Sequence, residues 1–198
     1  MNAKTELTGK DILDLETYIG VRDERRSKIL NKKKLRRVAV GPYATFYFEC
    51  YETMWYQVQE MLRIEKGGEA QLKDELEAYN PLIPKGRELV ATVMFEIDNA
   101  NIRTALLSGL GGVEEKFIMQ LDDEYIVAKP EEDLDRTNAA GKASSVQFVH
   151  FNFTIPQITK FKDEETNITV GINHTKYGHM AVLSPDTRDE LALSLIHI

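Results

Sequence analysis

The residues of this chain that could do chemistry are scattered carboxylates, amides, one arginine and one histidine. We single out seven candidate site residues: Glu49, Gln57, Gln59, Glu60, Arg63, Asn80 and His150. Carboxylate oxygens and an imidazole nitrogen are metal-ligand types, and the same groups can transfer protons. Amides and an arginine instead favour a polar surface that binds a ligand or a partner protein. The sequence therefore supports both a metal-site and a binding-surface interpretation.

The metal hypothesis depends on a few of these groups. Glu49 or Glu60, with Glu65 close by in sequence, supplies carboxylates and His150 supplies an imidazole, but no Glu-x-x-His motif accompanies them. His150 lies in the mostly apolar run 146–153, where a covered imidazole needs a hydrogen-bond partner. A core histidine bonded to a carboxylate or to the backbone is the simpler explanation, and a metal ligand or acid–base group is the alternative.

Common catalytic motifs are missing from the sequence. The glycines at 109, 111 and 112 lack the lysine or the spacing of a phosphate-binding loop. No close cysteine pair or His-Glu-x-x-His run offers a zinc site, and no segment resembles a nucleophile elbow. The sequence therefore assigns no cofactor.

A predicted β-hairpin positions Glu49. Two β-rich runs flank a turn signal: Arg37–Val40 and Thr45–Cys50 on either side of Gly41-Pro42. Because side chains alternate along a strand, Phe46, Phe48 and Cys50 fall on one face. Tyr47 and Glu49 then lie on the other, more polar face.

A predicted helix carries four of the other candidates, Gln57, Gln59, Glu60 and Arg63. Thr53 is expected to cap this helix, which runs to about Lys66. Its apolar stripe is expected to face the core: Met54, Val58, Met61 and Leu62. Glu60 could reach the sheet and Arg63 could pair with Glu49 or with an anion, but ordinary surface pairs are the simpler expectation for both. Asn80 is expected to cap the preceding helix or to join the polar surface.

The whole pattern predicts an α+β fold: a mostly antiparallel sheet with N-terminal helices and further helices packed on the sheet. The expected helices span residues 11–18, 21–35, 53–66, 69–79, 102–110 and 156–162, and a last one starts at Ser184. The expected strands span residues 37–40, 45–50, 89–97, 116–121, 125–128, 145–153 and 168–172.

Charge is unevenly distributed along the chain. The formal net charge is -7, yet the segment 22–37 holds nine basic residues against Asp23 and Glu24. Such a segment can bind along the phosphates of a nucleic acid, although the acidic remainder of the chain would repel them. The ordinary alternative is a helix face exposed to solvent. Trp55 with Tyr47, Tyr51 and Tyr56 could stack on bases, but aromatic residues at a strand-to-helix junction more often serve packing.

We expect one cytoplasmic globular domain over residues 1–192. No apolar run approaches the length that crosses a bilayer, and the start lacks the apolar stretch of a signal peptide. The single cysteine, Cys50, cannot form an internal disulfide. The last six residues, 193–198, match the translation of a sequencing-library adapter, so we expect a tail derived from assembled metagenomic DNA and exclude His197 as a ligand.

Four segments resemble an uncharacterised bacterial family, the domain of unknown function 3501: RRVAVGPYATFYFECYETMWYQVQEMLRIEK, ELEAYNPLIP, ELVATVMFEI and SSVQFVHFNF. The resemblance spans about residues 7–191. Genes of the family often lie beside those of rubrerythrin and of an iron–sulfur oxidoreductase, which implies a redox or oxidative-stress setting. Where the family usually has Phe-Glu-Asn, this chain has Phe48-Glu49-Cys50, so no role of the asparagine carries over, and Cys50 is expected to be an inert core thiol.

Three functional hypotheses follow, in order of preference. The first is a cytoplasmic accessory protein that binds a ligand or a partner protein, rubrerythrin or the iron–sulfur oxidoreductase, in an iron-dependent redox system. The second is a metal-dependent enzyme that uses Glu60 or Glu49 with His150. The third is nucleic-acid binding through the basic segment 22–37.

Overall fold

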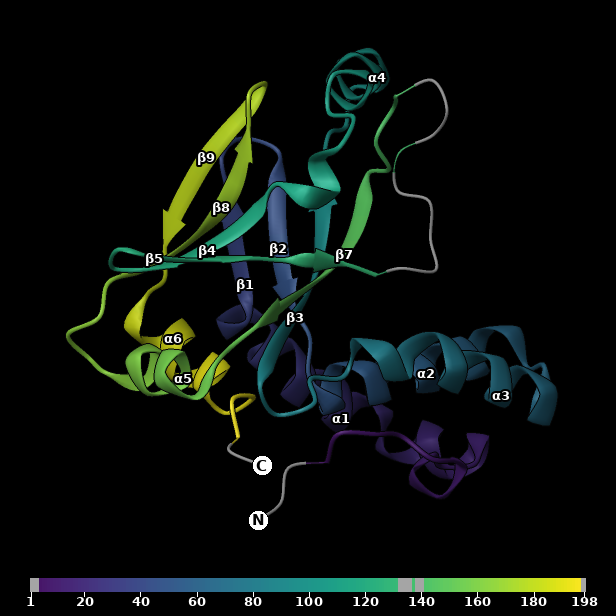
Figure 1. Cartoon of the computed structure of the whole chain (residues 1–198). Helices are drawn as coiled ribbons and strands as arrows, with labels where there is room; N and C mark the ends of the chain where they lie inside the picture. The colour runs from purple at the N-terminus through teal and green to yellow at the C-terminus, as the bar shows by residue number, and fades with distance from the viewer. Residues whose placement is uncertain (1–3, 132–136, 138–140, 197–198) are drawn as a thin grey trace.

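The computed structural model describes residues 4–131, 137 and 141–196, and it has the predicted α+β fold (Figure 1). Where one sheet was expected, the strands form two antiparallel sheets. The sequence pattern could not distinguish the two arrangements, because sheet membership depends on pairing between strands distant in the chain.

The first sheet has the strand order β1-β2-β3-β7-β6. Its strands are β1 (Arg37–Val40), β2 (Ala44–Phe48), β3 (Glu88–Phe95), β6 (Lys129–Pro130) and β7 (Val146–Asn152). The predicted hairpin is confirmed, with Val40 opposite Ala44 and a positive φ at Gly41 in the turn. On β3, Thr92 pairs with Tyr47 of β2 and with Phe148 of β7, so these three residues share the outer face of the sheet.

The second sheet has the order β5-β4-β8-β9, with β4 (Phe117–Leu121), β5 (Glu124–Val127), β8 (Ile168–His174) and β9 (Tyr177–Val182). Strand β9 was not predicted. It is an edge strand in which only Tyr177 is buried, so its side chains lack the apolar alternation by which strands are found.

The main core lies between the two sheets. Phe46 of β2 meets Phe117 of β4 edge to face, with ring centroids 5.8 Å apart. The Tyr177 hydroxyl of β9 donates to the Val40 carbonyl at 2.8 Å and accepts from the Ala44 N–H at 2.9 Å, so the second sheet also fixes the β1–β2 turn.

Three helices gather beside the first sheet (Figure 1): α1 (Leu15–Leu35), α2 (Tyr51–Glu65) and α3 (Gly68–Tyr79). Met54 and Val58 of α2 are buried in a second apolar cluster with Val90 on the outer face of β3. The prediction of two N-terminal helices was wrong, because one continuous helix starts where the Asp14 carboxylate caps the Thr17 N–H at 2.9 Å. Thr8 instead starts a separate turn, η1 (Gly9–Asp11).

The remaining helical segments are η2 (Asn80–Leu82), α4 (Ala100–Ser108), η3 (Val113–Glu115), α5 (Ile155–Lys162) and α6 (Pro185–Ala192). Ser184 caps α6 and supports its predicted start. Within the segment expected to be a foreign tail, Leu195 is buried in the main core and Ser194 accepts a hydrogen bond from Arg36 at 2.8 Å. His197 lies outside the described residues.

Candidate functional site

Glu49 lies just after β2, where its N–H still pairs with the Val90 carbonyl of β3 at 2.8 Å. The alternation along the strand turns its side chain to the outer face of the first sheet, as predicted, but there it is covered and only 8% exposed. Its Oε2 accepts from the Thr53 hydroxyl at 2.7 Å and its Oε1 from the Thr92 hydroxyl at 2.8 Å. Among the described residues, no lysine, arginine or histidine forms an ion pair with this carboxylate.

The start of α2 holds Thr53 in this position. Cys50, not Thr53, is the N-cap residue, and the Cys50 N–H donates to Thr53 Oγ1 at 2.9 Å in a capping box. The Thr53 hydroxyl in turn donates a hydrogen bond to the Glu49 carboxylate. The positive end of α2 and two hydroxyls therefore stabilise the carboxylate without a full positive charge.

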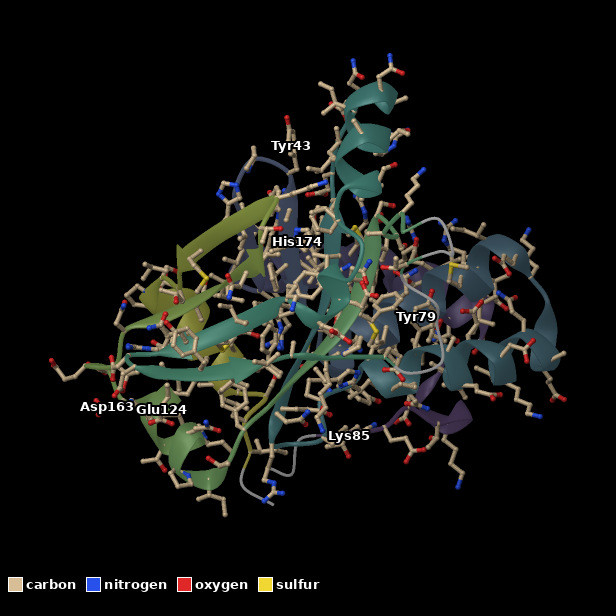
Figure 2. The ribbon with its side chains drawn as sticks, turned by 45° about the horizontal axis from the view of Figure 1, so that its top comes forward. Tyr43, Tyr79, Lys85, Glu124, Asp163 and His174 are labelled. Carbon is tan, nitrogen blue, oxygen red and sulfur yellow. The ribbon has the colours of Figure 1, made fainter. Side chains whose placement is uncertain are left out.

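A pocket of about 410 Å³ opens beside Glu49, between the outer face of the first sheet and helices α2 and α3. Its wall is largely apolar and comes from several elements: Met54, Leu82, Met94, Val146 and Phe148. Tyr79, labelled in Figure 2, lies at the end of α3 and lines the pocket near β7. The volume falls within the range of small-molecule sites, whose walls are mostly apolar with a few fixed polar groups.

Two cations that line this pocket are bound elsewhere. Arg36 is buried and donates to the carbonyls of Phe48 and Glu49, each at 2.9 Å, and its charge pairs with Glu190 at 3.0 Å. The Lys33 ammonium lies 5.8 Å from the centre of the Tyr56 ring. Neither charge neutralises the Glu49 carboxylate.

Gln57 is the other predicted site residue in this pocket. Its side-chain amide donates to the Tyr79 hydroxyl at 3.4 Å. Sequence reasoning missed Thr92 and Tyr79 as site residues. The alternation of β3 could have indicated Thr92, since this hydroxyl lies within a run of apolar residues, but its pairing with β2 depends on the long-range register.

Glu60 and Arg63 belong to an ion-pair cluster between α1 and α2. Glu60 accepts from Arg22 Nε at 2.8 Å, from the Tyr18 hydroxyl at 2.6 Å and from Arg63 at 3.1 Å. The hydrogen bonds from Arg22 lower the Glu60 pKa to about 2 although partial burial opposes this shift. The simpler expectation, ordinary side-chain pairs, is confirmed for both residues. The alternatives, Glu60 reaching the sheet and Arg63 pairing with Glu49, are not observed, because the three-residue spacing puts Arg63 beside Glu60 on one helix.

Gln59 and Asn80 support backbone segments instead of forming a polar docking surface. Gln59 is buried and donates to the Leu13 carbonyl at 3.3 Å. The Asn80 amide accepts from the Leu7 N–H at 2.7 Å and donates to the Leu7 carbonyl at 2.9 Å. The predicted polar surface is therefore divided, because these two side chains hold the N-terminal segment to the helices.

His150 lies between two carboxylates. Its Nδ1 is 3.0 Å from Glu88 Oε2, and its Nε2 is 2.7 Å from Glu131 Oε2. Burial favours the neutral imidazole, but the bonds to both carboxylates outweigh it and raise the His150 pKa. With both ring nitrogens engaged, His150 is the carboxylate-bonded histidine that the sequence favoured.

The three proposed metal ligands do not converge. His150 is opposite Val90 on the neighbouring strand, and Glu49 pairs with Val90 from the other side, which separates their backbones by two strand spacings, about 10 Å. The buried Val90 side chain lies between them, and Glu60 binds α1. Within the described part of the chain, no group of three or more histidine, cysteine, aspartate or glutamate side chains is arranged to hold a metal ion.

Cys50 also fits its expectation as an inert thiol. It is a free, buried cysteine, and burial raises the pKa of its thiol. A raised pKa keeps the sulfur protonated, and the thiolate is the reactive form.

The comparisons with known proteins agree with this architecture. The model of the family described as "Protein of unknown function (DUF3501)" matches residues 6–195. The chain belongs to the DUF3501 family. A crystal structure of a novel protein of unknown function from Burkholderia pseudomallei is 36% identical and superposes with a TM-score of 0.87, covering 96% of this chain and 98% of that one. The comparison with curated proteins gives no match.

The DUF3501 fold of this chain has no described helix that is long and apolar enough to cross a membrane. Because the family is one of unknown function, the function is argued from the Glu49 pocket.

Proposed function

We propose that the protein is a binding protein whose Glu49 pocket takes a small organic cation with an apolar body. The observation that carries the proposal is a buried carboxylate, held by two hydroxyls and no cation among the described residues, beside an apolar pocket of about 410 Å³. Burying a charge is costly unless it is paired. A protonated amine in the pocket would supply the missing positive charge.

The rest of the wall suits such a ligand. Tyr79 and Phe148 line the pocket, and aromatic rings attract cations, while Met54 and Met94 offer adaptable apolar surface. Arg36 and Lys33 would repel a cation only weakly, since Arg36 is paired with Glu190 and the Lys33 ammonium lies over Tyr56.

Binding is favoured over catalysis at this site. The Thr53 oxygen, the hydroxyl nearest Glu49, is committed to the Cys50 N–H at the start of α2 and is poorly placed to act as a nucleophile. His150, the proposed acid–base partner, is engaged by Glu88 and Glu131. The metal-dependent enzyme is accordingly the weaker proposal.

The redox setting implied by the family gives this binding role a context. We propose an accessory protein whose bound cation would be used by, or would signal to, a neighbouring rubrerythrin or iron–sulfur oxidoreductase. Its support is the gene neighbourhood that the resemblance to the family implies, and the buried Cys50 argues for a role other than thiol chemistry.

Ligand-observed NMR with three compounds of similar shape tests the binding role: benzylamine, benzyl alcohol and benzoate. We expect benzylamine to bind best and Glu49→Gln to weaken its binding by about tenfold or more, because a charge-assisted hydrogen bond is lost. Glu52→Gln is the matched control, since Glu52 starts the same helix but lines a different groove and faces Lys32. Stronger binding of benzoate, or benzylamine binding that Glu49→Gln leaves unchanged, would contradict the proposal.

A further inference from the structure

A second groove, on the other side of α2, is lined by three basic residues of α1 and two of the N-terminal segment. It encloses about 560 Å³ between α1, the first half of α2 and the N-terminal segment. Arg25, Lys28 and Lys32 line it from one face of α1, since residues three and four positions apart are neighbours on a helix. Lys4 and Lys10 line it from the N-terminal segment. None of its lining residues belongs to the Glu49 pocket.

The groove has more positive charge than its carboxylates neutralise. Its lining includes five cations and two carboxylates, Asp11 and Glu52. Asp11 pairs with Lys4 and Glu52 with Lys32. Outside the lining, Glu24 pairs with Lys28 and Glu190 also pairs with Lys32. Among the described residues, neither Lys10 nor Arg25 forms an ion pair with a carboxylate. The chain as a whole has a net charge of -7, so this excess of positive charge is confined to the groove and its surroundings.

Aromatic rings form the α2 side of the groove and hold one of these cations. The Arg25 guanidinium lies 5.4 Å from the centre of the Trp55 ring. Trp55 is itself fixed, because its indole N–H donates to the Asp11 carbonyl at 2.8 Å and its ring packs edge to face on Tyr18. Tyr51 and Tyr56 line the groove beside it. Arg25 is therefore oriented before any ligand arrives.

We propose that this groove binds a phosphorylated small molecule of nucleotide size. Arginine and lysine are the usual partners of phosphate oxygens, and an aromatic wall beside them suits an attached ring. The volume matches a single small ligand. A long nucleic-acid strand fits less well, because a strand leaving the groove would meet a protein of net negative charge.

Trp55 is the only tryptophan of the chain, so its fluorescence reports on this groove. We would titrate the full chain with ADP, pyrophosphate and adenosine. ADP and pyrophosphate are expected to shift the emission saturably, and adenosine is expected to bind at least about tenfold more weakly because it lacks charge-assisted bonds. The double variant Lys10→Gln/Arg25→Gln should weaken ADP binding by about tenfold or more.

The matched control is Arg26→Gln/Lys34→Gln, which removes the same charge from exposed positions of α1 outside the groove. It should leave ADP affinity within about twofold, because distant surface charges are screened. Equal losses of ADP affinity in both double variants would show that only the overall charge matters, and would overturn the proposal. The proposal would also be overturned if ADP up to millimolar concentration gave no saturable change in emission, or if an oligothymidylate bound far more tightly than ADP. Glu49→Gln should leave ADP binding unchanged, which separates this test from that of the Glu49 pocket.

Discussion

The Glu49 carboxylate accepts a hydrogen bond from the Thr92 hydroxyl at 2.8 Å although the two residues are 43 positions apart in the chain. The pairing of β2 with β3 creates this contact, since Thr92 is opposite Tyr47 and Glu49 follows two residues later. A charged group is thus held in a covered site by neutral donors. Such an arrangement costs stability, and the binding role proposed for the pocket would give the carboxylate a use.

The first prediction concerns the stability of Glu49→Gln. Because the native carboxylate lacks a cation, an amide of the same shape should leave the free energy of unfolding within about 1 kcal/mol of the parent value, or raise it. Urea denaturation at neutral pH measures this. A loss above about 3 kcal/mol would show that the carboxylate has a structural role.

The second prediction concerns the Glu60 ion pair. Arg22 holds the Glu60 pKa at about 2, below its ordinary value of 4.5. The ion pair therefore stabilises the fold fully above pH 4.5, and this contribution is lost as the pH falls toward about 2. Glu60→Gln should cost about 1–2 kcal/mol at pH 7 and progressively less in acid. Denaturation curves between pH 7 and pH 2 test this. Glu24→Gln is the control, because the Glu24–Lys28 pair is exposed and should contribute little.

The third prediction concerns His150. Its pKa is raised in the folded state, so its bonds to Glu88 and Glu131 stabilise the fold fully below pH 6.5 and this contribution is lost as the pH rises through the folded pKa. An NMR titration of the imidazole should give a pKa above 6.5, and Glu88→Gln or Glu131→Gln should lower it. A His150 pKa below 6.5 would contradict the two-carboxylate arrangement.

The fourth prediction concerns Leu195, within the segment that the sequence suggested to be foreign. Leu195 is 0% exposed in the main core, so Leu195→Ala should cost about 2–4 kcal/mol of unfolding free energy. Leu193, at 62% exposed, provides the matched control, and Leu193→Ala should have little effect. Equal, small effects would mean that these residues are dispensable for the fold.

Local patterns in the sequence predicted much of the fold. The Gly41-Pro42 turn gave the β1–β2 hairpin, and the apolar spacing of α2 placed Met54 and Val58 in the core. Strand β9 escaped prediction because only one of its side chains is buried. The start of α1 was misplaced because Thr8 and Asp14 are both good cap residues, and each starts its own helical segment.

The candidate site was less predictable, because its contacts join residues distant in sequence. The alternation of β2 correctly set Glu49 apart from the core face, but its bond to Thr92 depends on strand register. An ordinary side-chain pair was the simpler expectation for Glu60, but its partner Arg22 could not be named from the sequence. The two residues are 38 positions apart and meet only through the packing of α1 on α2. His150 was expected to need a partner, and the fold supplies Glu88 and Glu131.

Methyl NMR of the six methionines tests the Glu49 pocket most directly. Met54 and Met94 line this pocket, whereas Met119 is buried between the sheets and Met180 lies on the edge strand β9. On titration with benzylamine, the resonances of Met54 and Met94 should shift together and saturate, and those of Met119 and Met180 should stay in place. In Glu49→Gln the same shifts should need about tenfold more benzylamine or more. Shifts confined to Met119 or Met180, or shifts at Met54 and Met94 that saturate at the same benzylamine concentration in Glu49→Gln, would contradict a cation site at Glu49.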